Sequence, residues 1–147
     1  MADEHSTALD TLLRLSELMS ADLARFERES GLSGSRIRLL WTLGITGPTT
    51  QQALAEALDV TPRNVTGLVD GLSASGHVTR QPHPTDRRAT RVTLTDAGAE
   101  TVRDLQRDHE DLARQLFGGV PPRRLAAFVA TLEETVAIFE RLMEEQA

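Results

Sequence analysis

The amino-acid sequence predicts a mostly α-helical chain of the α+β class, in which one small β-hairpin interrupts a series of helices. Along most of the chain, apolar residues recur at three- and four-residue intervals, a spacing typical of amphipathic helices. Between residues 77 and 95 the spacing changes to an alternation of period two that is rich in β-branched residues, as strands are. A length of 147 residues is sufficient for one domain with a hydrophobic core.

The N-terminal part of the chain predicts two helices. Residues 7–28 carry a broad stripe of leucines with a methionine and a phenylalanine, and a stripe of this width suggests contact with more than one neighbour. Glycines end this pattern. Ser33 or Ser35 can then cap a second helix that extends to about Leu43. That helix is apolar on most sides, as expected of a central, buried element.

Two short helices joined by a tight turn follow. Thr49 and Gln52 have the spacing of a capping box, in which two side chains satisfy free backbone donors at the start of a helix. In the next helix, Thr61 is a suitable N-cap and Pro62 suits the first helical position. Gly76 ends it. The residues expected to be buried are Ala53, Leu54, Ala57 and Leu58 in the first of these helices, and Val65, Leu68, Val69 and Leu72 in the second.

A hairpin and two long helices complete the predicted order. The segments HVTRQP and ATRVTLT alternate as strands do, and HPTDRR between them supplies turn residues and charge. Thr95 can cap a helix over about 96–117, and two prolines open a last helix that ends near Glu144. We therefore predict a single domain over residues 1–147, with a winged helix-turn-helix lobe at 33–95.

The flanking segments, residues 5–30 and 96–147, are predicted to be dimerisation helices. Residues 7–28 and 121–144 each carry more apolar stripe than one small winged lobe can cover, and uncovered stripes of that size usually indicate a partner. The alternative, which the sequence leaves open, is that these helices cover each other within one chain.

The distribution of charge suggests a nucleic-acid partner, although the chain as a whole is acidic. Residues 61–91 contain five arginines and two aspartates, a net charge of +3, so the remainder of this −6 chain carries −9. A basic segment on an acidic body would confine contact with a polyanion to that segment.

The outward face of the 61–75 helix is predicted to contact the bases in the major groove of DNA. Arginine can bond bidentately to guanine and asparagine to adenine, which suits Arg63 and Asn64. Gly67 either allows close approach to DNA or is merely a tolerated helix glycine. Asp70 would repel phosphate, so we expect it to orient an arginine or to lie outside the interface. The bland alternative for the whole face is a solvated helix surface.

The hairpin tip, Asp86-Arg87-Arg88, is the predicted contact with the minor groove, where negative potential attracts an inserted arginine. An acid two residues before an arginine can hold its guanidinium by a bidentate pair. Alone, such a tip is more often a solvated charge run. The full set of predicted DNA contacts is Thr49, Thr50, Thr61, Arg63, Asn64, Thr66, Gly67, Arg80, Asp86, Arg87 and Arg88.

Three segments carry a resemblance to a known family: LAEALDVTPRNVTGLVDGL (54–72), GHVTR (76–80) and DRRATRVTLTDAG (86–98). In these the chain resembles the MarR family of bacterial transcription regulators, and the likeness extends over nearly its whole length. The resemblance implies a homodimer on a pseudo-palindromic operator, with Arg88 as the minor-groove arginine and Asp86 as its orienting partner. His77 departs from the family, which usually has an aliphatic or small residue there.

The resemblance also implies a small anionic or aromatic effector whose binding releases DNA. Arg14, Met19, Phe26 and Trp41 could line such a pocket, although core or surface is the better explanation for each of them. His109 lies on an apolar helical stripe, and we expect a core histidine there rather than a ligand.

Other functions find little support in the residue types. The absence of cysteine excludes disulfides, thiolate zinc sites and thiol-based sensing, and the four histidines are too scattered for a metal site. We find no nucleophile–base pairing or glycine-rich phosphate loop, so we expect neither an enzyme nor a cofactor. No membrane segment is expected, and the cytoplasm is the expected location. The main alternative is a winged-helix module that binds protein instead of DNA.

Overall fold

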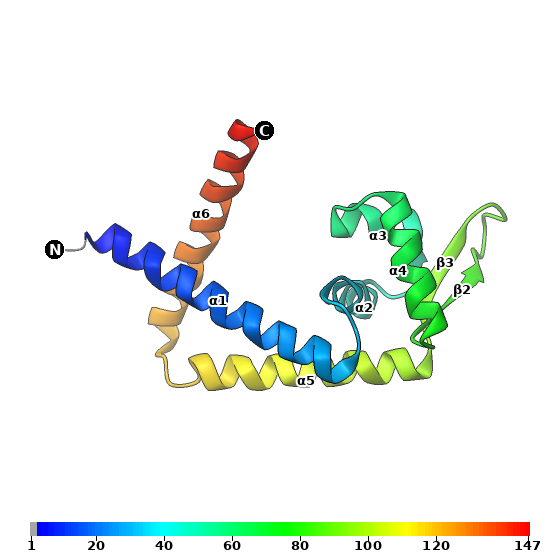
Figure 1. Ribbon diagram of the computed structural model, residues 1–147, viewed down its shortest axis with the longest axis horizontal. Coiled ribbons are helices and arrows are strands. Elements are labelled where there is room, and N and C mark those ends of the chain that lie inside the picture. The colour runs from blue at the N-terminus through cyan, green and yellow to red at the C-terminus, as the bar shows by residue number, and fades with distance from the viewer. Residues whose placement is uncertain (1–2) are drawn as a thin grey trace. The chain divides into compact units, whose positions relative to one another are not determined.

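The computed structural model describes residues 3–147 and confirms the predicted class, mostly helical with a small antiparallel sheet (Figure 1). The chain divides into two compact units, and the boundary lies between Arg103 and Asp104, within α5. The elements in chain order are α1 (Glu4–Ser30), α2 (Gly34–Thr46), β1 (Thr49–Thr50), α3 (Gln51–Leu58), α4 (Pro62–Ala74), β2 (Val78–Pro82), β3 (Thr90–Leu94), α5 (Asp96–Phe117) and α6 (Pro122–Gln146).

The start of α2 is capped twice. Of the two candidate serines, Ser33 is the N-cap, and its hydroxyl oxygen accepts the backbone N–H of Arg36 at 3.3 Å. The carboxylate of Glu27 in α1 accepts the N–H of Gly34 at 2.7 Å, which ties the end of α1 to the start of α2. The helix runs on through Gly44 to Thr46, beyond the predicted end, because one glycine costs a helix only about 1 kcal/mol.

The start of α3 differs from the prediction by one residue. Thr50, not Thr49, is the N-cap, and its hydroxyl oxygen accepts the N–H of Ala53 at 3.1 Å. Thr49 and Thr50 also form the short strand β1, which pairs with β3, so the sheet has three strands in the order β1-β3-β2 instead of two. A two-residue strand has no periodicity by which a sequence could reveal it. With the helix phase set by Thr50, Ala55 is buried and Ala57 is exposed.

The core of the first unit lies between α2, α3, α4 and the sheet. In α4, Val65, Val69 and Leu72 are buried and Leu68 is partly buried, as their spacing predicts. This burial fixes the rotation of α4 about its axis, so the opposite face of the helix points to solvent. The buried hydrophobic residues are Leu32, Leu39, Leu40, Leu43, Leu54, Ala55, Leu58, Val65, Val69, Leu72, Val78, Val92 and Val102.

The beginning of α5 is locked to the beginning of β2. Thr95 caps α5 by accepting the N–H of Gly98 at 3.0 Å, and its own hydroxyl donates to the carbonyl of Gly76 at 2.6 Å. The Thr95 backbone N–H donates to the carbonyl of His77 at 3.0 Å. The imidazole Nδ1 of His77 lies 2.7 Å from the hydroxyl oxygen of Ser75.

The long helices leave much apolar surface exposed. No residue of α1 or α6 is buried, and Phe139 remains 64% exposed. In the second unit the rings of Phe117 and Phe128 lie 6.0 Å apart at the turn between α5 and α6. The large exposed side chains of α1 are Leu9, Leu12, Leu13, Leu15, Leu18, Met19 and Leu23; those of the second unit are Leu112, Leu116, Phe117, Phe128, Val129, Val136, Ile138, Phe139, Leu142 and Met143.

Candidate nucleic-acid interface

The outward face of α4 forms an open depression at the N-terminal end of the helix. Thr61, Arg63, Asn64, Gly67 and Leu68 line it. The side chains of Arg63 and Asn64 make no hydrogen bond or ion pair to any other residue within 3–147, so both are available to an outside partner. A Cβ added to Gly67 would meet no atom within 4 Å, so the fold itself does not require glycine at this place.

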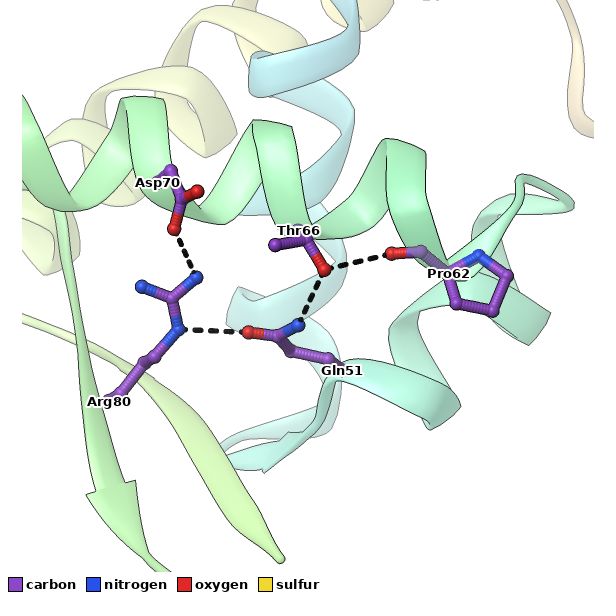
Figure 2. Close-up of polar contacts among 5 residues, drawn as sticks. All are labelled: Gln51, Pro62, Thr66, Asp70 and Arg80. Carbon is purple, nitrogen blue, oxygen red and sulfur yellow. Dashed lines mark hydrogen bonds and ion pairs between the residues drawn. The ribbon is translucent and has the colours of Figure 1, made fainter.

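A series of polar contacts links this face to the wing, which is the hairpin formed by β2, β3 and the turn between them (Figure 2). The carboxylate of Asp70 accepts from a terminal nitrogen of Arg80 at 2.5 Å. The Nε of Arg80 donates to Oε1 of Gln51 at 2.9 Å, and Nε2 of Gln51 donates to the hydroxyl oxygen of Thr66 at 3.2 Å. Thr66 in turn donates to the carbonyl of Pro62 at 3.0 Å. Asp70 therefore orients an arginine, one of the two roles expected for it.

The sequence did not suggest a role for Gln51 in this series of hydrogen bonds. Its partners Thr66 and Arg80 lie 15 and 29 residues away, and a single glutamine at the start of a helix has no pattern of its own. Only the packing of α3 against α4 and the sheet brings the three side chains together.

The wing tip is organised mainly by contacts to its backbone. Nδ1 of His83 accepts the N–H of Asp86 at 3.1 Å and faces that of Thr85 at 3.3 Å. Asp86 accepts the backbone N–H of Arg88 at 3.0 Å. The expected pairing of the Asp86 carboxylate with the Arg88 guanidinium is not formed between these two described residues, because the turn brings the backbone, not the side chain, to the carboxylate. Neither Arg87 nor Arg88 has a side-chain ion pair or hydrogen bond within residues 3–147.

The remaining candidates lie in different surroundings. The hydroxyl oxygens of Thr50 and Thr61 serve as helix caps, and Thr49 lies half-buried in β1. Arg91, which no prediction assigned to the interface, has a buried Nε without a hydrogen-bond partner among the described residues. The chain therefore brings Arg63, Asn64, Thr66, Gly67 and Arg80 to one region and carries Arg87 and Arg88 on the hairpin tip.

The residues considered for an effector pocket are dispersed over α1 and α2. Arg14 and Met19 are exposed on α1, and Phe26 and Trp41 are half-buried. The open depression on α4 includes none of these four residues, and neither does a second depression in the described part of the chain. The second of these depressions lies within the second unit and is lined by Leu116, Phe117, Val120, Arg124, Leu125 and Phe128.

Two further properties concern residues 3–147 only. Within this part, no three histidine or acidic side chains are grouped closely enough to hold a metal ion. None of its helices combines the length and the apolar character that crossing a bilayer requires.

Comparison with known proteins gives consistent likenesses. The sequence matches the model of the MarR family over residues 30–89. An uncharacterized HTH-type transcriptional regulator of Mycobacterium bovis is 34% identical over 116 residues, 74% of this chain and 81% of that protein. The HTH-type transcriptional repressor YetL of Bacillus subtilis is 27% identical over 137 residues, 90% of this chain and 78% of that protein. The crystal structure of Streptococcus pneumoniae FabT in complex with DNA superposes with a TM-score of 0.81 at 19% identity, covering 95% of this chain and 99% of that one.

Proposed function

Because this chain belongs to the MarR family of transcriptional regulators, we propose that it binds a pseudo-palindromic DNA operator as a homodimer and represses transcription until an effector releases it. The repressor role is supported by the likeness to YetL, and the DNA partner by the likeness to a fold that has been crystallised on DNA. The expected site of action is the cytoplasm, where a bacterial chromosome lies.

One observation carries the proposal: the solvent face of α4 presents Arg63 and Asn64 without any partner among the described residues, beside a glycine that the fold does not need. An α-helix fits the major groove, and its N-terminal residues usually meet the base edges. In the proposed complex Arg63 and Asn64 read bases, while Arg87 and Arg88 extend from the wing toward the minor groove. Further contacts are proposed at Thr49, Thr50, Thr61, Thr66, Gly67, Arg80 and Asp86.

The first experiment is selection of bound sequences from random duplex DNA, followed by affinity measurements at several salt concentrations. We expect a selected half-site and an affinity that falls steeply with salt, because arginine–phosphate contacts release counterions. Arg63→Ala or Asn64→Ala should weaken binding to the selected duplex about tenfold and relax the preference at one position, since one bidentate base contact is lost.

The competing function is a winged-helix module that binds protein. It is favoured if the full chain binds no duplex even at low salt but forms a stable complex with another protein. In that case Arg87 and Arg88 of the wing have no role in DNA recognition.

The proposed dimer is supported by the exposed apolar stripes of α1 and of the second unit. Phe139→Asp should shift the full chain from a dimer toward a monomer of 16.1 kDa in sedimentation equilibrium, because burying a charge at an apolar interface is costly. Ile45→Asp is the matched control, since Ile45 is 71% exposed but lies in α2. A wild-type chain that is already monomeric at micromolar concentration contradicts the dimer.

The proposed effector is a small anionic or aromatic compound, with Arg14, Met19, Phe26 and Trp41 as candidate pocket residues. The family assignment supports it, and the measurement that tests it is displacement of bound duplex by an aromatic carboxylate such as benzoate. No displacement by such compounds counts against this class of effector.

A further inference from the structure

We propose that Gln51 is a specificity-positioning residue: the hydrogen-bond chain from Asp70 through Arg80 and Gln51 makes the Thr66 hydroxyl an acceptor toward DNA, selective for a base that presents an exocyclic amino group in the major groove. The inference rests on the proposed function, since it assigns a base chemistry to one contact of the DNA-reading face.

The direction of each hydrogen bond in this series follows from Arg80. A guanidinium has only donors, so the atom of Gln51 that faces Nε of Arg80 at 2.9 Å must be the amide oxygen. The Gln51 amide is thereby held in one orientation, with its NH₂ group facing Thr66 at 3.2 Å. The ion pair with Asp70 at 2.5 Å anchors the other side of the guanidinium, so that Arg80 itself is fixed (Figure 2).

The state of the Thr66 hydroxyl follows from its two partners. A carbonyl can only accept, so the single hydroxyl proton must point to the carbonyl of Pro62, 3.0 Å away. The Gln51 amide donates to one of the two lone pairs of the hydroxyl oxygen. What remains for an outside partner is one lone pair and no proton. Thr66 is exposed, so this lone pair is accessible from solvent.

An acceptor without a proton discriminates among bases in the major groove. Adenine N6 and cytosine N4 are donors there, whereas guanine N7 and O6 and thymine O4 are acceptors. The Thr66 oxygen can therefore bond to adenine or cytosine and is repelled by guanine and thymine at the same position. Phosphate oxygens are acceptors too, so the same reasoning makes Thr66 a base contact and not a backbone contact.

The neighbours of Thr66 behave differently. Arg63 and Asn64 have no side-chain partner among the described residues and can reorient to suit several bases. The donor and acceptor state of Thr66, by contrast, is already set before DNA arrives. Its contribution to selectivity is therefore pre-organised: the Pro62 carbonyl takes the hydroxyl proton, and the Gln51 amide, by donating to the hydroxyl oxygen, holds the hydroxyl in that orientation.

The test uses the full chain and a duplex selected by the wild type from a random library. Adenines of the half-site are replaced one at a time by purine, and cytosines by 2-pyrimidinone, which removes only the amino group. Besides any adenine read by Asn64, which Asn64→Ala identifies, we expect one such position at which the wild type loses about three- to tenfold in affinity, the effect of one hydrogen bond. Thr66→Val, which keeps the shape and removes the hydroxyl, should bind the two duplexes equally at that position.

The role of Gln51 is tested by a measurement that a loss of packing alone would not change. Gln51→Met should lower the ratio of affinities for the amino-bearing and amino-free duplexes, whereas mere loss of packing would weaken both duplexes alike. Thr66→Ser, which retains the hydroxyl, should keep the discrimination. Thermal melting of each variant separates a folding defect from a change in selectivity.

The outcomes distinguish this inference from the proposed function. If the wild type selects a duplex but Thr66→Val retains the full amino-group discrimination, the inference is wrong and the DNA-binding function stands. The inference is equally wrong if Gln51→Met leaves the affinity ratio unchanged. If the wild type selects no duplex at all, the proposed function fails, and the inference with it.

Discussion

Replacement of Gly98 by alanine should lower the free energy of unfolding by about 2–4 kcal/mol and the melting temperature by about 5–15 °C. A Cβ at this position would lie 1.9 Å from the backbone oxygen of His77. That oxygen cannot turn aside, because it accepts the N–H of Thr95 at 3.0 Å and belongs to the residue before β2. Alanine is otherwise the better helix former, so intrinsic propensity predicts the opposite sign.

The matched control is Gly67→Ala in α4, measured by the same thermal or denaturant unfolding. Nothing lies within 4 Å of its added methyl, so the free energy of unfolding should rise by up to about 1 kcal/mol. The same variant should bind duplex DNA more weakly, because the methyl occupies the face proposed to approach the groove. A Gly98→Ala protein that melts at or above the wild-type temperature would show that α5 and β2 are not held this closely.

Arg88→Ala should weaken binding to every duplex by at least about tenfold at moderate salt and reduce the salt slope by about one. The Arg88 guanidinium has no partner within residues 3–147, while its backbone N–H is held by Asp86 at 3.0 Å. Within residues 3–147, therefore, no acidic group competes for the Arg88 guanidinium, and a hydrogen bond holds the backbone of the turn that carries it. Because a groove arginine responds chiefly to electrostatic potential, the loss should differ little between the selected duplex and an unrelated one.

A control for Arg88→Ala is Arg103→Ala, which removes the same charge from an exposed position on α5. Anisotropy titrations of both variants at two salt concentrations separate a local contact from the general effect of one charge. If Arg88→Ala and the wild type bind the selected duplex with equal affinity, the wing tip does not contact DNA.

The elements with strong local signals were predictable. Thr61 and Pro62 begin α4 as expected, and Thr95 caps α5, because a cap requires only a few consecutive residues. The alternation in β2 and β3 likewise lies within each strand. The choice between Thr49 and Thr50 as the cap of α3 was not decided locally, since both are threonines and the pairing of β1 with β3 selects the second.

The interface was predictable in its residue types but not in its contacts. The positions of Asp70 and Asp86 near arginines suggested orienting roles, but the sequence could not say which group each would hold. Asp70 reaches Arg80 across ten residues, and Asp86 holds the backbone of Arg88 instead of its side chain. Gln51 was absent from the prediction because its partners come from two other elements.

The sequence by itself determined the order of the helices, the winged helix-turn-helix and the face of α4 that points outward. These follow from periodicity, caps and turn residues, which act over a few positions. Tertiary structure alone decided the third strand, the need for glycine at position 98 and the direction of the hydrogen-bond chain that ends at Thr66. Each of these depends on atoms far apart in the chain, and their distances are set only when the core brings the elements together.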